Sequence, residues 1–214
     1  MDKPTRSIQW IVWSGLTLVM LAIVVSFVAT RLGVGVRSEA GALPVIGAVA
    51  DFALTNQTGR VVTLADLGGR VWVADIIFTR CPGACAKMTR EMSELQVALP
   101  AGDSVSLVSL TADPGFDTPD VLKRYGDQFG ASPERWHFLT GRKPDLYELA
   151  MRGLLLAVGE TQPDQRESEN DLFIHSTKFI LIDQQGRIRG KYEGTEPKSR
   201  GQILKAVQTL LTEK

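Results

Sequence analysis

Residues 71–85 read Val-Trp-Val-Ala-Asp-Ile-Ile-Phe-Thr-Arg-Cys-Pro-Gly-Ala-Cys, an apolar run that leads into two closely spaced cysteines. Its first eight residues are apolar except for Asp75, which predicts a strand that is buried on both faces of a sheet. Cys81 and Cys85 follow at once, and a helix is expected to begin near Pro82 because proline suits the first helical turn. The two cysteines should therefore lie at the junction between a buried strand and a helix.

Strands and helices alternate on either side of this stretch. Short apolar runs predict strands, and apolar residues at spacings of three and four predict helices. The expected strands are 51–54, 61–64, 105–110, 136–139, 173–182 and 188–192, and the expected helices are 82–99, 118–129, 144–151 and 197–211. This alternation implies a mixed α/β sheet that is mostly parallel and flanked by helices. An N-terminal βαβ unit followed by a C-terminal hairpin and helix is, by its topology, the thioredoxin-like arrangement.

The N-terminal segment is expected to anchor the chain in a membrane. No charged residue occurs between Ser7 and Thr30. A helix over this stretch would rise roughly 36 Å, enough to cross a hydrocarbon core of about 30 Å. Trp10 and Trp13 lie near one end, where indole rings favour the interface. We therefore predict a single transmembrane helix over residues 1–30, with a cleaved signal peptide as the alternative.

The rest of the chain has the composition of an ordinary globular domain. We predict a linker over residues 31–46 and one folded domain over residues 47–214. Lys and Arg total 24 and Asp and Glu total 24, so neither a nucleic-acid partner nor an acidic disordered tail is indicated. The chain has only two cysteines and two histidines. A single close Cys pair indicates redox or metal chemistry, because a disulfide-stapled fold would need more cysteines.

Cys81 and Cys85 are the candidate reactive residues. Backbone N–H groups at a helix start would stabilise a thiolate at Cys81, and a helical spacing of four would turn both sulfurs to the same side. Such a pair can form a disulfide or hold a soft metal ion, whereas a pair of buried and inert cysteines is the alternative. Redox enzymes of the thioredoxin type use Cys-x-x-Cys, so three intervening residues are a poorer match to electron exchange.

His175 is the candidate third ligand. It begins a predicted strand, and in this fold the loop before that strand approaches the cysteine turn. Cu(I) accepts two thiolates and one imidazole, whereas structural zinc usually takes four ligands. His137 lies inside a short strand and is predicted to be structural; if it converged on the same place, a Cys2His2 zinc site would result. The polar residues 161–171 are expected to form an exposed loop beside His175.

Several motifs together resemble the Sco/SenC family of copper chaperones. Residues 78–85 look like the ligand loop of that family, and residues 110–119 are similar to its Asp-Pro…Asp-Thr-Pro stretch. Residues 136–141 look like its Trp-x-x-Leu-Thr-Gly segment, and His175 matches its distal ligand histidine. The resemblance covers about residues 45–210, and its specificity lies in the combination rather than in any one piece.

The resemblance implies a copper-binding metallochaperone that supports assembly of the copper centre of cytochrome c oxidase. By matching position, Cys81, Cys85 and His175 become the copper ligands. The implied location is the inner (cell) membrane, single-pass, with the soluble domain on the periplasmic side. The expected partners are the oxidase subunit that carries the copper site, other copper chaperones and thiol reductants. Some family members instead reduce disulfides, so the same pair is also a candidate catalytic pair of a thiol-disulfide oxidoreductase. A redox or copper sensor is a third alternative.

Two positions depart from the family pattern. The family usually has Pro directly after the second cysteine, where this chain has Ala86, and Asp directly before the histidine, where this chain has Ile174. A missing carboxylate would change how the imidazole is oriented, so we expect altered metal affinity or redox tuning. Asp171 is the candidate substitute.

Overall fold

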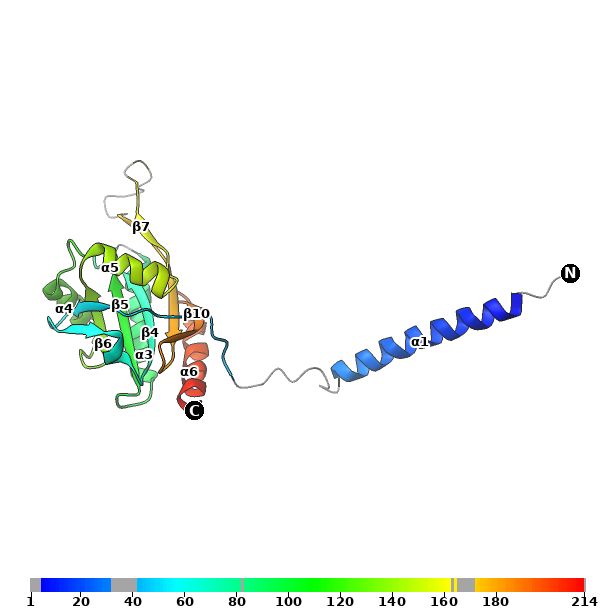
Figure 1. Ribbon diagram of the computed structural model, residues 1–214. Helices are drawn as coiled ribbons and strands as arrows, with labels where there is room; N and C mark the ends of the chain where they lie inside the picture. Colours follow the sequence, from blue (N-terminus) through cyan, green and yellow to red (C-terminus); the bar gives the residue numbers. More distant parts are fainter. Residues whose placement is uncertain (1–4, 32–41, 82, 163, 165–171, 214) are drawn as a thin grey trace. The chain divides into compact units, whose positions relative to one another are not determined.

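The computed structural model describes residues 5–31, 42–81, 83–162, 164 and 172–213. The chain divides into two compact units, residues 1–41 and 42–214. The first unit holds the helix α1 (Thr5–Arg31), drawn in blue in Figure 1. Its described side chains are apolar for the most part and exposed.

Among the described residues, no helix is long and apolar enough to cross a membrane. The transmembrane helix expected over residues 1–30 is therefore not confirmed. Side chains of α1 are described only from Trp10 to Val25.

The second unit is built on an eight-stranded mixed sheet, and Figure 1 labels most of its strands. The strand order is β1-β10-β9-β4-β5-β6-β2-β3. The strands are β1 (Gly47–Ala48), β2 (Ala53–Asn56), β3 (Val61–Thr63), β4 (Val71–Ile77), β5 (Val105–Thr111), β6 (Trp136–Thr140), β9 (Lys178–Ile182) and β10 (Arg187–Glu193). The central strands β4, β5 and β6 pair in parallel, and the flanking pairs are antiparallel. The predicted mixed sheet is confirmed, but the expectation that it is mostly parallel is wrong, because only β4–β5 and β5–β6 pair in parallel among the described strands.

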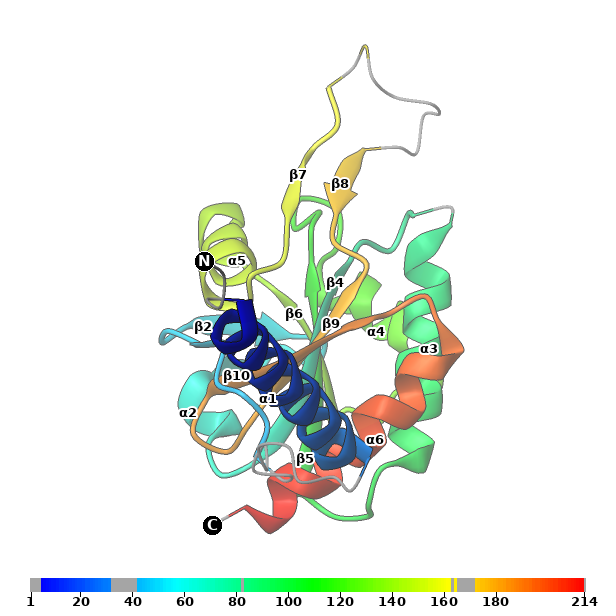
Figure 2. The same ribbon diagram turned by 90° about the vertical axis from the view of Figure 1, so that its right-hand side faces the viewer.

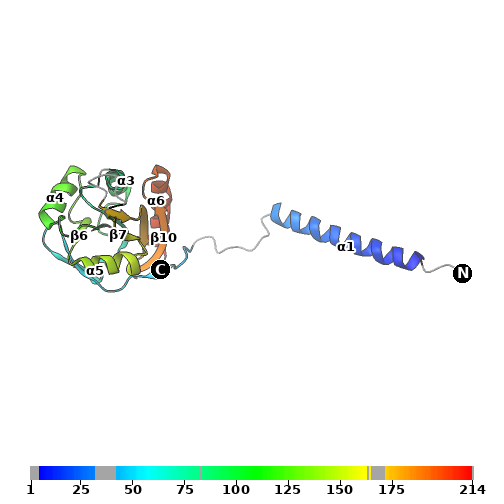
Figure 3. The ribbon, with the colours of Figure 1, turned by 90° about the horizontal axis from the view of Figure 1, so that it is seen from above.

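Helices cover both faces of this sheet, as Figure 2 shows. One face carries α3 (Ala84–Ala98), α4 (Pro119–Gln128) and α6 (Pro197–Thr212), whose buried side chains share a core with β4 and β5. The other face carries α2 (Leu64–Leu67), α5 (Lys143–Glu148) and the π-helical turn η1 (Leu149–Gly153). The view from above in Figure 3 shows the same arrangement, with α5 opposite α3 and α6. The sheet therefore lies between two apolar layers.

Local signals set the ends of several elements. Thr118 accepts a hydrogen bond from the backbone of Val121, and Pro119 begins α4, so the predicted cap is confirmed. Gly59 and Gly186 have positive φ angles of 79° and 74° in the tight turns β2–β3 and β9–β10. Glycine adopts this conformation without steric cost, which fixes both hairpins.

The strand predicted over residues 173–182 is instead two strands in two different sheets. β8 (Phe173–His175) pairs with β7 (Val158–Glu160), whereas β9 belongs to the central sheet. The break has a physical reason: the backbone N–H of Ser176 donates to Ala157 at 2.8 Å rather than to a neighbour in the central sheet. The β7–β8 ribbon projects beyond the sheet in Figure 2. Most of the predicted loop 161–171 lies outside the described residues.

The helix predicted over residues 144–151 also differs in form. It starts one residue earlier than predicted and changes after Glu148 into η1, which ends at Gly153. A Cβ at Gly153 would lie 2.8 Å from the side chain of Leu149, so glycine permits the close packing of this wider turn.

Candidate metal centre

The two cysteines lie where β4 turns into α3. The backbone N–H of Cys81 donates to the carbonyl of Phe78 at 3.2 Å, which closes the turn. α3 begins at Ala84, two residues later than predicted, because Gly83 has the non-helical angles φ −142° and ψ −93°. Cys85 lies in the first turn of α3 and is buried, whereas Cys81 is half-buried. Both cysteines are free thiols in this structure.

The imidazole of His175 reaches this turn from β8. Its Nε2 atom lies 3.1 Å from the Sγ atom of Cys85. Its Nδ1 atom lies 3.2 Å from the carbonyl oxygen of Ser176, so an Nδ1–H donor leaves the Nε2 lone pair directed at the cysteines. The ring packs edge-on against Phe78, with centroids 5.6 Å apart.

The structure brings all three predicted ligands together. One ligand atom from each of Cys81, Cys85 and His175 lies within 4.8 Å of the others. Two sulfurs and one imidazole nitrogen form a soft donor set that suits Cu(I), while a tetrahedral structural zinc site needs a fourth ligand. Ligation itself remains a prediction.

His137 does not belong to this cluster among the residues that the structure describes. It lies on β6 and is buried, and its Nδ1 atom is 3.5 Å from the amide nitrogen of Asn56. Burial lowers the pKa of His137, and the charges of Arg60 and Arg70 lower it further. The imidazole is therefore neutral and packed into the fold, in line with the structural role that the sequence predicts.

The electrostatics of the two cysteines are unequal. The hydrogen bond from the Cys85 thiol is the largest cause that lowers the pKa of Cys81 to about 4, and His175 and the N–H groups of the helix start add to it. Burial raises the pKa of Cys85, and the negative charge on Cys81 raises it further. At neutral pH the pair therefore holds one thiolate and one thiol. Burial opposes a charge on His175, but its hydrogen bonds to Cys81 and to Ser176 outweigh burial and raise its pKa.

A buried carboxylate clamps the cysteine turn to the end of β5. Asp117 accepts hydrogen bonds from the backbone and the hydroxyl of Thr79, and from the hydroxyl of Thr111 at 2.5 Å. Burial raises the pKa of Asp117, although these donors lower it in part. Because Thr79 lies two residues before Cys81, the clamp fixes where the ligand loop begins.

The rim of the centre carries a cation and exposed apolar side chains. The guanidinium of Arg80 binds Asp113 at 2.5 Å and lies 4.2 Å above the ring of Phe116. Phe116 is 44% exposed and Ile174 is 59% exposed. The residue before the histidine therefore presents an apolar surface where the family has a carboxylate. Asp171 lies outside the described residues.

Asp75 is a residue whose importance sequence reasoning missed. Its side chain lies inside β4 with no exposed surface. Neither carboxyl oxygen makes a well-formed hydrogen bond to a described residue. Burial raises the pKa of Asp75 to about 7, while the nearby Ser109 hydroxyl and the charge of His175 lower it. The available signal was its position as a lone charge in an otherwise apolar strand.

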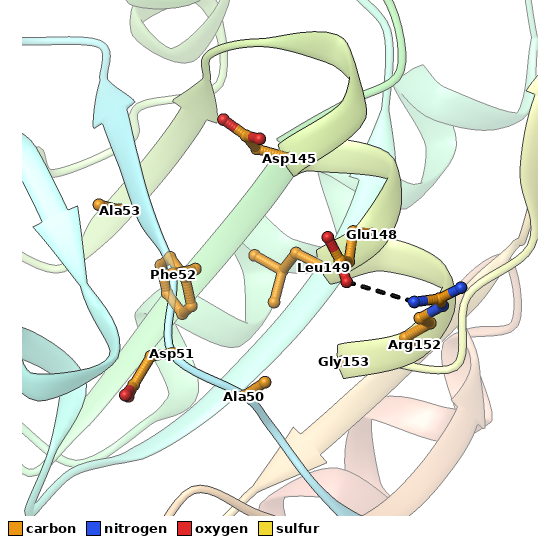
Figure 4. A pocket seen from close by; sticks show the side chains of 9 residues that line it. All are labelled: Ala50, Asp51, Phe52, Ala53, Asp145, Glu148, Leu149, Arg152 and Gly153. Atoms are coloured by element: carbon orange, nitrogen blue, oxygen red, sulfur yellow. Dashed lines mark hydrogen bonds and ion pairs between the residues drawn. The ribbon is translucent and has the colours of Figure 1, made fainter.

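One cavity of the second unit lies away from the cysteines. It has a volume of about 510 Å³ and is lined by residues 50–53, Asp145, Glu148, Leu149, Arg152 and Gly153. Figure 4 shows the ion pair between Glu148 and Arg152 at its edge. None of its lining residues is a cysteine or a histidine, so the metal-binding chemistry lies elsewhere.

Comparisons with known proteins agree on one family. The family model described as SCO1/SenC matches residues 45–212. The SCO1 protein homolog of Bacillus subtilis (strain 168) is 32% identical over 166 residues, which cover 77% of this chain and 83% of that protein. BsSco is described as a member of the Sco family of cytochrome c oxidase assembly proteins with a disulfide switch. Its solved structure is 30% identical to this chain and has a TM-score of 0.69. The match covers 81% of this chain and 99% of that chain. Bradyrhizobium japonicum ScoI with copper bound shares the fold, with a TM-score of 0.64 at 21% identity over 76% of this chain and 99% of that chain.

Proposed function

Since the chain belongs to the SCO1/SenC family, we propose that it is a copper metallochaperone that holds its cargo through Cys81, Cys85 and His175. The observation that carries this proposal is the convergence of two sulfurs and one imidazole nitrogen within 4.8 Å. The binding of copper by the related ScoI supports the choice of metal. Soft sulfur ligands favour Cu(I) over hard cations such as Mg²⁺.

Copper would leave by ligand exchange. A thiolate of the partner bonds to Cu(I) while the bond from Cu(I) to Cys81 breaks, so no electron changes hands. Cys81 is the sulfur that departs first, because it is half-buried whereas Cys85 is buried. Its low pKa keeps the departing sulfur as a stable thiolate without the need for a proton.

The proposed recipient is the cytochrome c oxidase subunit that carries a copper site, in keeping with the description of BsSco as an assembly protein for this enzyme. The rim of the centre offers a surface for such a partner: the exposed side chain of Phe116, which lies under the guanidinium of Arg80, and the exposed side chain of Ile174. An apolar rim of this kind suits a partner loop with apolar side chains.

The N-terminal unit is proposed to attach the protein to the cell membrane, with the folded unit on the periplasmic side. The exposed apolar side chains of α1 between Trp10 and Val25 support this proposal. Membranes would be washed with alkaline carbonate and then extracted with detergent. Release by carbonate alone, or protection of the folded unit from protease in spheroplasts, would contradict the proposal.

The test of copper binding is an anaerobic Cu(I) titration of the reduced full-length chain in mild detergent against a competing chelator. One copper per chain is expected, with affinity reduced at least about tenfold in Cys85→Ser and in His175→Ala, since each loses one of three ligands. His137→Ala is the matched control and should bind as the wild type does. Equal Cu(I) affinities of the wild type and of His175→Ala would show that the histidine is not a ligand.

A second candidate function is thiol-disulfide exchange by the same pair. The unequal cysteines favour it, because Cys81 is an accessible thiolate and the proton on Cys85 can leave when the pair closes to a disulfide. In that step the Cys81 thiolate attacks a partner disulfide and releases one partner sulfur. Cys85 then loses its proton and attacks the Cys81 sulfur of the mixed disulfide, which releases the second partner sulfur. The proton from Cys85 and one proton from water leave the partner with two thiols. Reduction of a disulfide substrate in the absence of tight Cu(I) binding would make this the main function.

A further inference from the structure

His175 lies on a ribbon that is not part of the central sheet. Among the described strands, β7 and β8 pair only with each other, in a separate two-stranded sheet. A two-stranded ribbon is only marginally stable by itself, so contacts outside the ribbon must fix where its residues lie. The position of His175 beside the cysteines therefore depends on how the side chains of β8 pack against the domain.

Phe78 provides this packing from the cysteine turn. It follows directly after β4, and its side chain is buried. Its ring lies 5.2 Å from the ring of Phe173 at an interplanar angle of 64°, and 5.6 Å from the imidazole of His175 at 89°. Phe173 and His175 share one face of β8, because side chains alternate along a strand, and Ile174 between them is exposed. Both contacts are edge-on, which is a favoured geometry for aromatic rings.

The backbone of Phe78 contacts the cysteines at the same time. Its N–H donates to the Sγ atom of Cys85 at 3.4 Å, and its carbonyl accepts from the N–H of Cys81 at 3.2 Å. In this arrangement the Nε2 atom of His175 lies 3.1 Å from the sulfur of Cys85. One residue therefore contacts all three proposed ligands, the two cysteines through its main chain and the histidine through its ring.

We propose that Phe78 is a positioning residue, which holds His175 against the cysteine turn in the metal-free protein so that all three ligands are in place before copper binds. The inference rests on the proposed function, because it assumes that Cys81, Cys85 and His175 bind copper. Without the ring of Phe78, only a fraction of the molecules would have His175 in place. The apparent affinity for copper would be reduced by that fraction.

The experiment is a double-mutant cycle. The Cu(I) affinity of the reduced full-length chain in mild detergent would be measured anaerobically against a competing chelator, for the wild type, Phe78→Leu, His175→Ala and the double variant. Leucine keeps an apolar side chain in the core but has no ring to pack edge-on. Phe78→Leu should lower the affinity of the wild type about tenfold, as expected if His175 is in place in about one molecule in ten. In the His175→Ala background the same substitution should leave the affinity unchanged, because Phe78 acts through the imidazole.

Phe138→Leu is the matched control for a lost core ring. Phe138 is a fully buried phenylalanine on β6, and its ring contacts are with Tyr125 and Trp136. This variant loses an aromatic ring from the core as Phe78→Leu does, but it loses no ring contact with β8. Its Cu(I) affinity should equal that of the wild type.

A second measurement uses the metal-free protein. The chain has only two histidines, so selective ¹⁵N-histidine labelling gives backbone NMR signals from His137 and His175 alone. In Phe78→Leu the backbone order parameter of His175 should fall from about 0.85 to below about 0.6, because β8 is no longer restrained. His137 is the internal reference and should keep its wild-type value.

Equal Cu(I) affinities of the wild type and of Phe78→Leu would overturn the inference and leave the proposed function in place. A loss of affinity that persists in the His175→Ala background would also overturn it, because Phe78 would then act on the cysteine turn. If the wild type bound no Cu(I) tightly, the proposed function would fail, and the order parameter of His175 would decide whether the ring positions it. If Phe78→Leu does not fold, the same measurements on Phe173→Leu, which removes a half-buried ring, take its place: an unchanged affinity and order parameter would overturn the inference.

Discussion

At the scale of single residues, the centre depends on the difference between two identical side chains. Cys81 and Cys85 are separated by three residues, yet one is a thiolate and the other a thiol. The helix start and the neighbouring thiol stabilise charge on the first, whereas burial opposes charge on the second. Cys81 can thus attack a partner, or be released from one, as a thiolate. Cys85 keeps its proton meanwhile.

This asymmetry predicts the effect of removing the inner sulfur. Cys85→Ala deletes the hydrogen bond that contributes most to the low pKa of Cys81, so that pKa should rise from about 4 toward the usual range near 8.5. The rate of iodoacetamide alkylation of Cys81, measured between pH 4 and pH 9, reports the change. His137→Ala serves as the control with an unshifted profile. An unshifted profile in Cys85→Ala would show that the backbone of the helix start suffices.

At the scale of elements, the ligand loop depends on its attachment to the end of β5. Asp117 accepts hydrogen bonds from Thr79, in the connection between β4 and α3, and from Thr111, at the end of β5. Such a clamp restricts the loop that carries Cys81, because the hydrogen bonds begin two residues before the sulfur. The geometry of the metal centre is therefore set partly by residues that touch no metal.

Removal of the clamp should reduce stability and metal affinity together. Asp117→Ala leaves the buried donors of Thr79 and Thr111 unpaired, so the free energy of unfolding should fall by about 2–3 kcal/mol. Urea unfolding of the reduced protein measures this change, and a Cu(I) titration measures the loss of affinity. Asp127→Ala removes only an exposed ion pair with Lys123 and should change stability by less than about 0.5 kcal/mol. Similar losses in both variants would argue against a clamp.

The individual helices and strands also show which parts of the fold could be predicted from the sequence. β4, α4 and the hairpin β9–β10 follow from apolar runs, a Thr-Pro cap and a glycine turn, all of which are local signals. The division of residues 173–182 depends on the pairing of β8 with β7, a partner earlier in the chain that no local pattern specifies. Cys81, Cys85 and His175 could be predicted from their motifs, whereas the Asp117 network requires two loops to meet in space.

At the scale of the whole molecule, the charge on Asp75 connects the core to the pH dependence of stability. Its pKa in the folded state is about 7, above the value of 3.8 for the unfolded chain. The unfolded chain therefore releases its proton first as pH rises. Stability from this group is complete below about pH 3.8 and is lost as pH rises through 7, by about 4 kcal/mol in all.

Comparison of the wild type with Asp75→Asn separates the contribution of Asp75 to the pH dependence of stability from the contributions of Cys81 and His175. The metal-free wild type and Asp75→Asn would be unfolded in urea at a series of pH values from 4 to 8. The difference between their free energies of unfolding should shift by several kcal/mol in favour of the variant as pH rises. A constant difference across the series would mean that the carboxyl does not change its charge in this range.

The position of His175 on the β7–β8 ribbon has a further consequence for this protein when copper is bound. His175 and Cys85 are 90 residues apart in the chain, and a copper ion held by both would cross-link the β7–β8 ribbon to the first turn of α3. By the entropy of loop closure, a cross-link over such a length restrains the unfolded chain by more than about 4 kcal/mol. Bound copper would thus join the ribbon to the turn between β4 and α3, and release of copper would remove this link. A partner that binds the ribbon would then distinguish the copper-loaded protein from the copper-free protein by how rigidly the ribbon is held.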